Sequence, residues 1–243
     1  MKYVTRFNPT TNGDLHLGHL YIILFNIQAA QDSGGKFLVR FEDNSIDTLV
    51  GMTGAEMRLF TEHHLAALYW LGIDADGVSR QSELDLPLKE FVARHEWFIP
   101  QYRWPYSIPL NPVYNSIDPD RGEWFPYAPY LTYNKVIYDE LTGVNLLIRG
   151  DDLRSEFSLY QHYRAELQLP EITHYYMPRL YGHEDEIVSK FHGAKSILEY
   201  KKLGWKPDDI IGLLAQSALV DPVRGWQLTN VKRYPRLDKA FST

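Results

Sequence analysis

The sequence predicts an α/β protein in which helices flank a parallel β-sheet. Segments typical of strands and segments typical of helices alternate from residue 1 to about residue 98, as they do in βαβ units. Residues 2–7 suit a strand, residues 8–14 are rich in turn formers, and residues 20–31 have the apolar spacing of a helix. An apolar strand at 34–44 follows and ends in the carboxylates Glu42 and Asp43.

Further helices are predicted where apolar residues recur every three or four positions. These segments are residues 54–71, 86–95 and 155–167, with a short helical region at 195–203 and 208–218. The segment from 98 to 130 differs, because it holds seven prolines among tryptophans and tyrosines, and prolines stop helices and regular strands from running far. We expect irregular structure there and a return to α/β character near residue 133.

Composition is that of a compact enzyme domain. With 243 residues, 44% of them hydrophobic and 23% charged, the chain can bury a sizeable core as one or two lobes. It lacks an apolar run of about 18 residues and an N-terminal signal segment, so we expect a cytoplasmic protein with no membrane partner. The absence of cysteine excludes disulfides and thiolate catalysis. A net charge of −6 does not suggest a dedicated nucleic-acid binder.

The most informative segment is the histidine motif, residues 16–19, which stands where the first strand should meet the first helix. Gly18 falls in the first helical turn, where the missing Cβ lets a nucleotide approach the backbone. His16 and His19 could donate hydrogen bonds to negative charge that develops at an α-phosphorus in a transition state. The alternative is a helix cap with two surface histidines.

Three later segments accompany this motif: 40–44, which reads R-F-E-D-N, 149–152, which reads R-G-D-D, and 187–194, which contains Ser189 and Lys190. In this order the four segments resemble the catalytic domain of class I aminoacyl-tRNA synthetases, in the glutamyl branch. That family reads R-F-A-P-S-P-T-G-x-L-H-x-G-H, R-I-E-D-T-D, V-x-R-G-x-D and K-x-S-K-R-x-G-A. Residues 68–74 and 80–83 also resemble family segments, so the likeness covers most of the chain.

The resemblance implies a Rossmann-like parallel sheet with a HIGH-type and a KMSKS-type motif, a short connective insertion and a small C-terminal helical region. The corresponding division is 1–98 for the first half of the catalytic domain, 99–130 for the shortened insertion, 131–180 for the second half, and 181–243 for the KMSKS-like loop and helical region. The family's acceptor-stem-binding insertion is longer, and we expect its anticodon-binding half to be absent. The paralogue that glutamylates queuosine in tRNA(Asp) also lacks that half, but it keeps the insertion and usually a zinc site. We expect no zinc here.

By the same resemblance, ATP and Mg²⁺ are the cofactors. His16 and His19 would stabilise the transition state at the α-phosphate, and Gly18 would make room for the nucleotide. Ser189 and Lys190 would bind the β- and γ-phosphates. The family's preceding lysine corresponds to Ile187, so one cation is lost.

The resemblance also assigns the amino-acid pocket. Glu42 would hold the α-ammonium group, Arg6 would bind the side-chain carboxylate, and Arg149 would be a second binding arginine. The bidentate geometry of guanidinium groups suits both arginines for these roles. The alternative is that these arginines form structural ion pairs with Asp43 or Asp152. The remaining pocket positions correspond to Asn8, Thr10, Tyr130, Leu131, Tyr133 and Lys135. Several of them differ from the family, so glutamate leads but a related amino acid stays open.

These expectations define an AMP-forming ligase that activates glutamate or a related amino acid and releases pyrophosphate. The acceptor is either a tRNA or a non-standard one, such as a small amine, a hydroxyl or a carrier protein in a biosynthetic pathway. Two other classes remain. One is a small-substrate nucleotidyltransferase, in which a similar histidine motif occurs, and the other is a non-catalytic paralogue.

Overall fold

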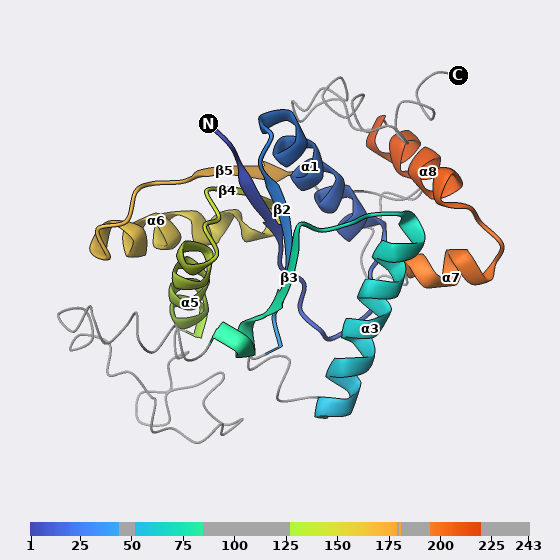
Figure 1. Ribbon diagram of the computed structural model, residues 1–243, viewed down its shortest axis with the longest axis horizontal. Helices are drawn as coiled ribbons and strands as arrows, with labels where there is room; N and C mark the ends of the chain where they lie inside the picture. Colours follow the sequence, from blue (N-terminus) through green and yellow to red (C-terminus); the bar gives the residue numbers. More distant parts are fainter. Residues whose placement is uncertain (44–51, 85–126, 179, 181–194, 220–243) are drawn as a thin grey trace.

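The computed structural model describes residues 1–43, 52–84, 127–178, 180 and 195–219. Five parallel strands run through its centre (Figure 1). Strands β1 (Val4–Phe7), β2 (Lys36–Phe41) and β3 (Gly77–Arg80) form one sheet, and β4 (Leu146–Gly150) pairs with β5 (Thr173–Met177).

Strand β4 lies beside β1 and connects the two sheets. Just before β4, the backbone N–H of Asn145 donates to the carbonyl oxygen of Val4 over 3.1 Å. The Asn145 side chain accepts from the Val4 N–H and donates to the carbonyl oxygen of Lys2. The strands therefore run in the order β3-β2-β1-β4-β5, which is a doubly wound arrangement.

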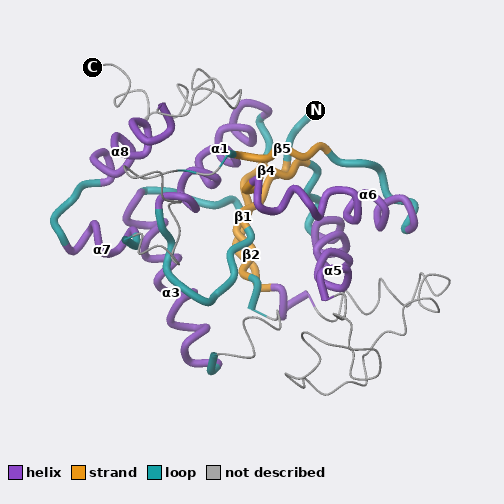
Figure 2. Tube along the Cα trace, turned by 180° about the vertical axis from the view of Figure 1, so that it is seen from behind, coloured by secondary structure: helices purple, strands orange, loops and turns teal. Residues whose placement is uncertain are grey.

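Helices cover both faces of these strands (Figures 1 and 2). Helices α1 (Leu17–Ser33), α3 (Gly54–Leu71), α7 (Ile197–Lys202) and α8 (Pro207–Leu219) share one hydrophobic core, and α5 (Tyr127–Leu141) and α6 (Phe157–Glu166) share another. Short 3₁₀ helices η1 (Gln81–Leu84) and η4 (Asp151–Glu156) follow β3 and β4. None of the helices in these ranges is long and apolar enough to cross a membrane.

Alternating side chains of the central strands divide between the two cores. In β2, Phe37, Val39 and Phe41 pack in the α1 core, whereas Leu38 packs against the α5 core. Because side chains of a strand alternate between faces, Arg40 shares the face of Leu38. In β1, Arg6 shares the face of Val4 by the same rule and is paired in register with Leu38. Two arginines therefore enter the interface between the sheet and α5.

The predicted α/β fold with a parallel sheet is confirmed. The helix expected at 54–71 has these bounds in the structure, because Thr53 and Glu56 form a capping box and Gly72, at φ 66°, ends the helix. Helix α1 starts at Leu17, three residues before the predicted start. The helix predicted at 155–167 begins with 3₁₀ geometry, and the helices predicted at 195–203 and 208–218 correspond to α7 and α8. The segment 86–95 lies outside the described residues.

The expectation of irregular structure up to residue 130 is wrong at its end. Helix α5 begins at Tyr127, so the expected boundary between 130 and 131 falls inside a helix. Pro129 is tolerated because it lies in the first turn, where a backbone N–H has no partner within the helix. The spacing of Tyr133, Val136 and Ile137, all buried, is the helical signal that the prolines obscured.

Candidate functional site

The strand order places the candidate site at the edge of the sheet where β1 and β4 end. From β1 the sheet continues through β2 and β3, and from β4 it continues in the opposite direction through β5. In open α/β sheets, ligands bind beyond the carboxyl ends of the strands at such a switch point. The histidine motif follows β1, and Arg149 lies in the last part of β4. Both predicted motifs therefore lie at this edge.

The two histidines cap helix α1 with their side chains. His16 is the N-cap residue, and its Nδ1 accepts from the Gly18 N–H over 3.1 Å, while Nδ1 of His19 accepts from the His16 N–H over 3.2 Å. Their ring centroids are 3.9 Å apart. An Nδ1 atom that accepts carries no proton, so each ring carries its proton on Nε2. The capping alternative is thus realised, but His16 is buried and His19 is half-buried, so they are not surface histidines.

Neighbouring elements hold the loop that leads into this cap. His63 on α3 contacts Asp14 (Nδ1 to Oδ1, 2.8 Å), and Nε2 of the buried His64 lies 2.6 Å from the Gly13 carbonyl oxygen. On the other side, His16 forms an antiparallel bridge with Ser196, and the Ile197 N–H donates to the Leu15 carbonyl oxygen over 2.7 Å. The segment that follows the predicted lysine loop therefore reaches the histidine motif.

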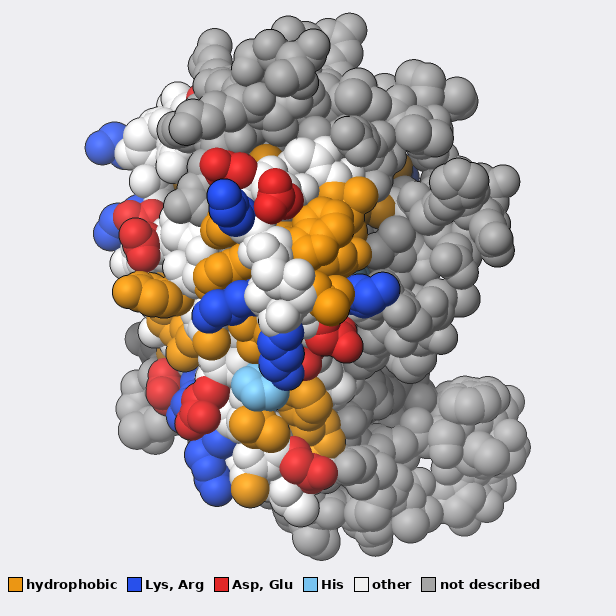
Figure 3. Space-filling view, turned by 90° about the vertical axis from the view of Figure 1, so that its right-hand side faces the viewer, with side chains coloured by type: hydrophobic (Ala, Val, Ile, Leu, Met, Phe, Trp, Pro, Cys, Tyr) orange, Lys and Arg blue, Asp and Glu red, His pale blue; other side chains and the backbone are white. Residues whose placement is uncertain are grey.

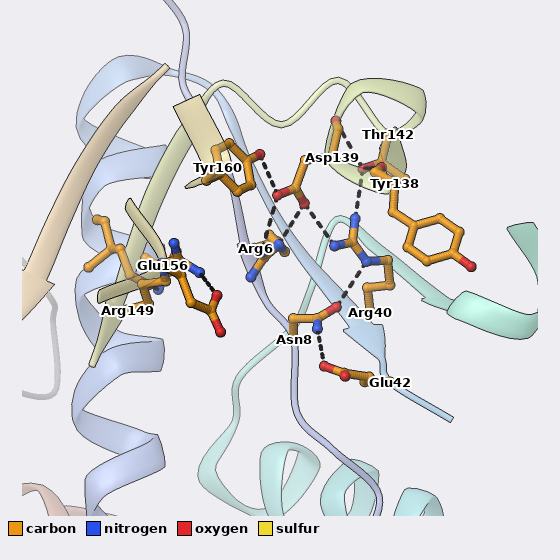
Figure 4. Close-up of polar contacts among 12 residues, drawn as sticks. Arg6, Asn8, Arg40, Glu42, Tyr138, Asp139, Thr142, Arg149, Glu156 and Tyr160 are labelled. Carbon is orange, nitrogen blue, oxygen red and sulfur yellow. Dashed lines mark hydrogen bonds and ion pairs between the residues drawn. The ribbon is translucent and has the colours of Figure 1, made fainter. Parts of the chain in front are cut away.

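A buried polar network connects three of the predicted pocket residues (Figure 4). Arg6 forms a bidentate pair with Asp139 of α5, at 2.7 and 3.0 Å, and Arg40 donates to the same carboxylate over 2.8 Å. Arg40 Nε also donates to Asn8 Oδ1 over 2.9 Å, and Asn8 Nδ2 donates to Glu42 Oε2 over 3.0 Å. Arg6, Asn8 and Glu42 thus belong to one chain of hydrogen bonds.

Asp139 is the electrostatic centre of this network. Burial opposes its charged form, but the charges of Arg6 and Arg40 and the hydrogen bonds from Arg6 and Tyr160 outweigh burial and hold the pKa of Asp139 well below its usual range. Burial and the Asp139 charge raise the pKa of Tyr160 well above its ordinary value. The carboxylate is therefore ionised and Tyr160 is a neutral donor near pH 7, which suits a fixed scaffold rather than proton transfer.

A second charged group surrounds Arg149. Its Nη1 donates to Glu156 Oε2 over 3.0 Å, and Glu156 Oε1 also pairs with Lys135 at 3.5 Å. The guanidinium lies over the rings of Tyr160 and Tyr176, each centroid 5.7 Å away. Its buried Nε atom has no hydrogen-bond partner among the described residues. A buried N–H without a partner is costly, so this atom is a candidate contact for an acceptor on a ligand.

Comparison with known proteins finds similarity to one family over the N-terminal part of the chain. Residues 2–94 match the family described as tRNA synthetases class I (E and Q), catalytic domain. The chain is 26% identical to a glutamate–tRNA ligase of Dichelobacter nodosus, over 88% of this chain and 56% of that protein. It is 27% identical to that of Oleidesulfovibrio alaskensis, over 100% of this chain and 61% of that protein. Residues 2–94 therefore resemble the catalytic domain of class I glutamyl-tRNA synthetases.

A solved structure shares this fold. The crystal structure of glutamate–tRNA synthetase from Elizabethkingia anophelis matches with a TM-score of 0.60 and 17% identity, over 88% of this chain and 61% of that one. With the coverage of the two ligases above, this means that the chain spans less than two thirds of each of these three proteins.

Of the residues predicted for the synthetase-like domain, the structure places most around the switch point. Arg6 and Arg149 are ion-paired, as the alternative interpretation required, but with Asp139 and Glu156. Asp43 instead accepts from Ser82, through its backbone N–H and its hydroxyl. The roles assigned to Arg6, Asn8, Glu42 and Arg149 stay predictions.

The other predicted pocket residues are less closely joined to the network. Thr10 forms a parallel bridge with Glu42, and its hydroxyl donates to Asn12 Oδ1. Tyr133 is buried edge-on against Tyr163 in the α5 core, and burial raises its pKa to about 12. Ser189 and Lys190 lie outside the described residues, as do the side chains of Tyr130 and Leu131.

Sequence reasoning missed four residues of the site, namely Arg40, Asp139, Glu156 and Tyr160. Two of them carry a signal in hindsight. Arg40 interrupts an apolar strand, and Asp139 follows Val136, Ile137 and Tyr138 on a helix whose buried residues would lead one to expect an apolar side chain. A charge in such a position is seldom fully buried without a partner. Arg40 therefore predicts a carboxylate elsewhere in the core, and Asp139 predicts a cation there.

Proposed function

We propose that this domain activates an amino acid with ATP, forming an aminoacyl-adenylate and pyrophosphate. A carboxylate oxygen of the amino acid forms a bond to the α-phosphorus, and the bond from that phosphorus to the bridging oxygen of pyrophosphate breaks with its electron pair. The observation that carries the proposal is the position of the capped histidine pair at the switch point, beside the buried network of Arg6, Asn8 and Glu42. This arrangement supports a phosphate-binding group and an amino-acid-binding group at the same edge of the sheet.

The histidines would act as hydrogen-bond donors rather than as bases. With Nδ1 engaged in the helix cap, the Nε2–H of each ring can point a donor at charge developing on the α-phosphate, close to the positive end of the α1 dipole. Donors fixed before the reaction stabilise the transition state without reorganisation. No covalent intermediate with the protein is needed.

The described residues contain no group of three or more His, Cys, Asp or Glu side chains that could hold a metal ion. We propose that Mg²⁺ arrives with the nucleotide, because Mg²⁺ at such sites is held mainly by phosphate oxygens and water. When bound, Mg²⁺ would neutralise negative charge on the phosphates. Lys190 is proposed to supply further positive charge to the β- and γ-phosphates.

Charge balance supports an acidic amino acid as substrate. The two groups contain four cations, Arg6, Arg40, Lys135 and Arg149, and three carboxylates, Glu42, Asp139 and Glu156. One positive charge remains, which complements the net negative charge of glutamate. Glu42 would bind the α-ammonium group, and the unpartnered Nε of Arg149 offers a donor to a carboxylate. Glutamate or a close analogue is therefore the proposed substrate.

We propose a tRNA as the first acceptor to test, because the two relatives described above are glutamate–tRNA ligases. Figure 3 shows one face of the molecule, on which the described side chains mix Lys and Arg with Asp, Glu and hydrophobic residues rather than forming a continuous basic stripe. A non-standard acceptor, with tRNA-independent ligation, is the second candidate and is supported by the net charge of −6, because polyanion binding depends on neutralisation of phosphates by cations.

Pyrophosphate exchange with labelled ATP, run with each common amino acid in turn, tests the activation step. We expect exchange with glutamate that falls about 10²-fold or more in His19→Asn, whereas His162→Asn, on the exposed side of α6, keeps full exchange. Silence with every amino acid would overturn the proposal. Incubation with labelled glutamate and total tRNA then separates the acceptors, because label at a tRNA 3′ end supports charging and adenylate alone supports a non-standard acceptor.

A further inference from the structure

Asp139 takes no direct part in the activation step proposed above. Its side chain is fully buried and accepts four hydrogen bonds: from Nε and Nη2 of Arg6 at 2.7 and 3.0 Å, from Nη2 of Arg40 at 2.8 Å, and from the Tyr160 hydroxyl at 2.8 Å. A carboxylate offers about four acceptor sites, so all of them are used. An arrangement with two arginines and a tyrosine around one carboxylate sets the direction of each donor.

The first consequence concerns the orientation of Arg6. Its fork of Nε and Nη2 faces Asp139 (Figure 4), so the guanidinium plane is fixed by a bidentate pair. Nη1 is the nitrogen that Asp139 leaves unengaged. A substrate carboxylate can therefore approach Arg6 through Nη1 and the second N–H of Nη2, because Asp139 occupies only the fork formed by Nε and Nη2.

The second consequence concerns Asn8 and Glu42, at the other end of the hydrogen-bond network. Arg40 uses Nη2 for Asp139 and Nε for Asn8 Oδ1, and this acceptor contact turns Asn8 Nδ2 towards Glu42 Oε2. The orientation of the asparagine amide is thus dictated by a donor on one side and an acceptor on the other. Asp139 is connected by successive hydrogen bonds to the carboxylate proposed to hold the α-ammonium group.

We propose that Asp139 is a positioning residue for amino-acid recognition: it directs Arg6 Nη1 towards the acidic side chain of the substrate and, through Arg40 and Asn8, holds Glu42 in place for the ammonium group. This rests on the proposed function for the identity of the ligand. It makes Asp139 a determinant of amino-acid affinity and not of ATP affinity, since the histidine cap lies outside the hydrogen bonds that Asp139 forms.

Direct binding measured by calorimetry tests this proposal separately from catalysis. Glutamate and ATP are titrated into the wild-type protein and into Asp139→Asn, in which the amide nitrogen faces an arginine donor. The matched control is Glu140→Gln, because Glu140 is the next residue of α5 and pairs with the buried Arg164 at 3.1 Å, apart from the network. We expect glutamate affinity to fall at least tenfold in Asp139→Asn, with ATP affinity within twofold of wild type, and neither to change in Glu140→Gln.

Tyr160→Phe provides a second variant if Asp139→Asn does not fold. It removes one of the four donors and keeps the charges and nearly all of the volume, so a twofold to fivefold loss of glutamate affinity is expected without a change for ATP. Equal losses of glutamate and ATP affinity, unchanged glutamate affinity in both variants, or no glutamate binding by the wild-type protein would each overturn the proposal. Glutamate binding without pyrophosphate exchange would instead overturn the activation reaction and leave the positioning role standing.

Discussion

His174 makes the stability of this protein depend on pH in a way that can be calculated. Burial, followed by the charge of Arg149, lowers the pKa of His174 from 6.5 to about 3. Its ring packs against Tyr160 and Phe157, and Nδ1 lies 3.1 Å from the Tyr176 hydroxyl. The folded protein therefore keeps a neutral imidazole at pH values where the unfolded chain already binds a proton.

Stability from this group is present above pH 6.5 and is lost as the pH falls towards 3, because protons then bind the unfolded state preferentially. Between about pH 7.5 and about pH 5 the shift corresponds to about 2 kcal/mol. The ring is only partly buried, and solvent screening reduces the expected loss to about 1 kcal/mol. His174→Asn, which keeps a polar group near the Nδ1 position, should remove this contribution.

Urea unfolding at the two pH values measures the difference directly. On acidification, the free energy of unfolding should fall by about 1 kcal/mol more in the wild-type protein than in His174→Asn. His162→Asn, altered on the exposed side of α6, should follow the wild type. Parallel losses in the wild type and His174→Asn would refute the reasoning, since they would show that the imidazole titrates alike in both states.

Three further predictions concern the scaffold and the site. In Gly35→Ala the new Cβ would overlap the Tyr3 carbonyl oxygen, so the free energy of unfolding should fall by at least about 2 kcal/mol. In Gly34→Ala, at φ 64° with no atom near the new Cβ, the free energy of unfolding should fall by only about 1 kcal/mol. Thermal or urea unfolding compares the two variants. His16→Ala should lower stability by about 1 kcal/mol through loss of the N-cap, and His16→Asn should restore stability without restoring pyrophosphate exchange; recovery of both would contradict the donor role. Glu156→Gln leaves Arg149 and Lys135 without their shared carboxylate. Adding Lys135→Met to this variant should therefore recover at least about 0.5 kcal/mol of unfolding free energy in a double-mutant cycle. Strictly additive effects would show that the two cations do not interact.

The sequence predicts the parallel sheet and the position of the histidine motif because both depend on local signals. Turn formers, apolar spacing and capping residues such as Thr53 and Glu56 act within a few positions of each other. Helix α5 is missed because its early proline is read as a break, although the first turn tolerates it.

Asp139 is missed for a different reason. Its role depends on Arg6 and Arg40, which lie 133 and 99 positions away in the chain. The ion-pair alternative for Arg6 is right in kind but wrong in partner, because Asp43 is near in sequence and Asp139 is near only after folding. Local reasoning identifies the residues that follow strand ends, and the tertiary fold selects the charges that surround them.

The bridge between His16 and Ser196 has a consequence for synthesis of the chain. These residues are separated by 180 positions, so the histidine motif leaves the ribosome long before the segment that contains Ser196 is synthesised. At about 5–20 residues per second, the cap region waits on the order of ten to forty seconds for Ser196 and Ile197. The five strands of the described residues are all made before that point, and a nascent chain can therefore complete this sheet while the loop before α1 still lacks its contact with Ser196.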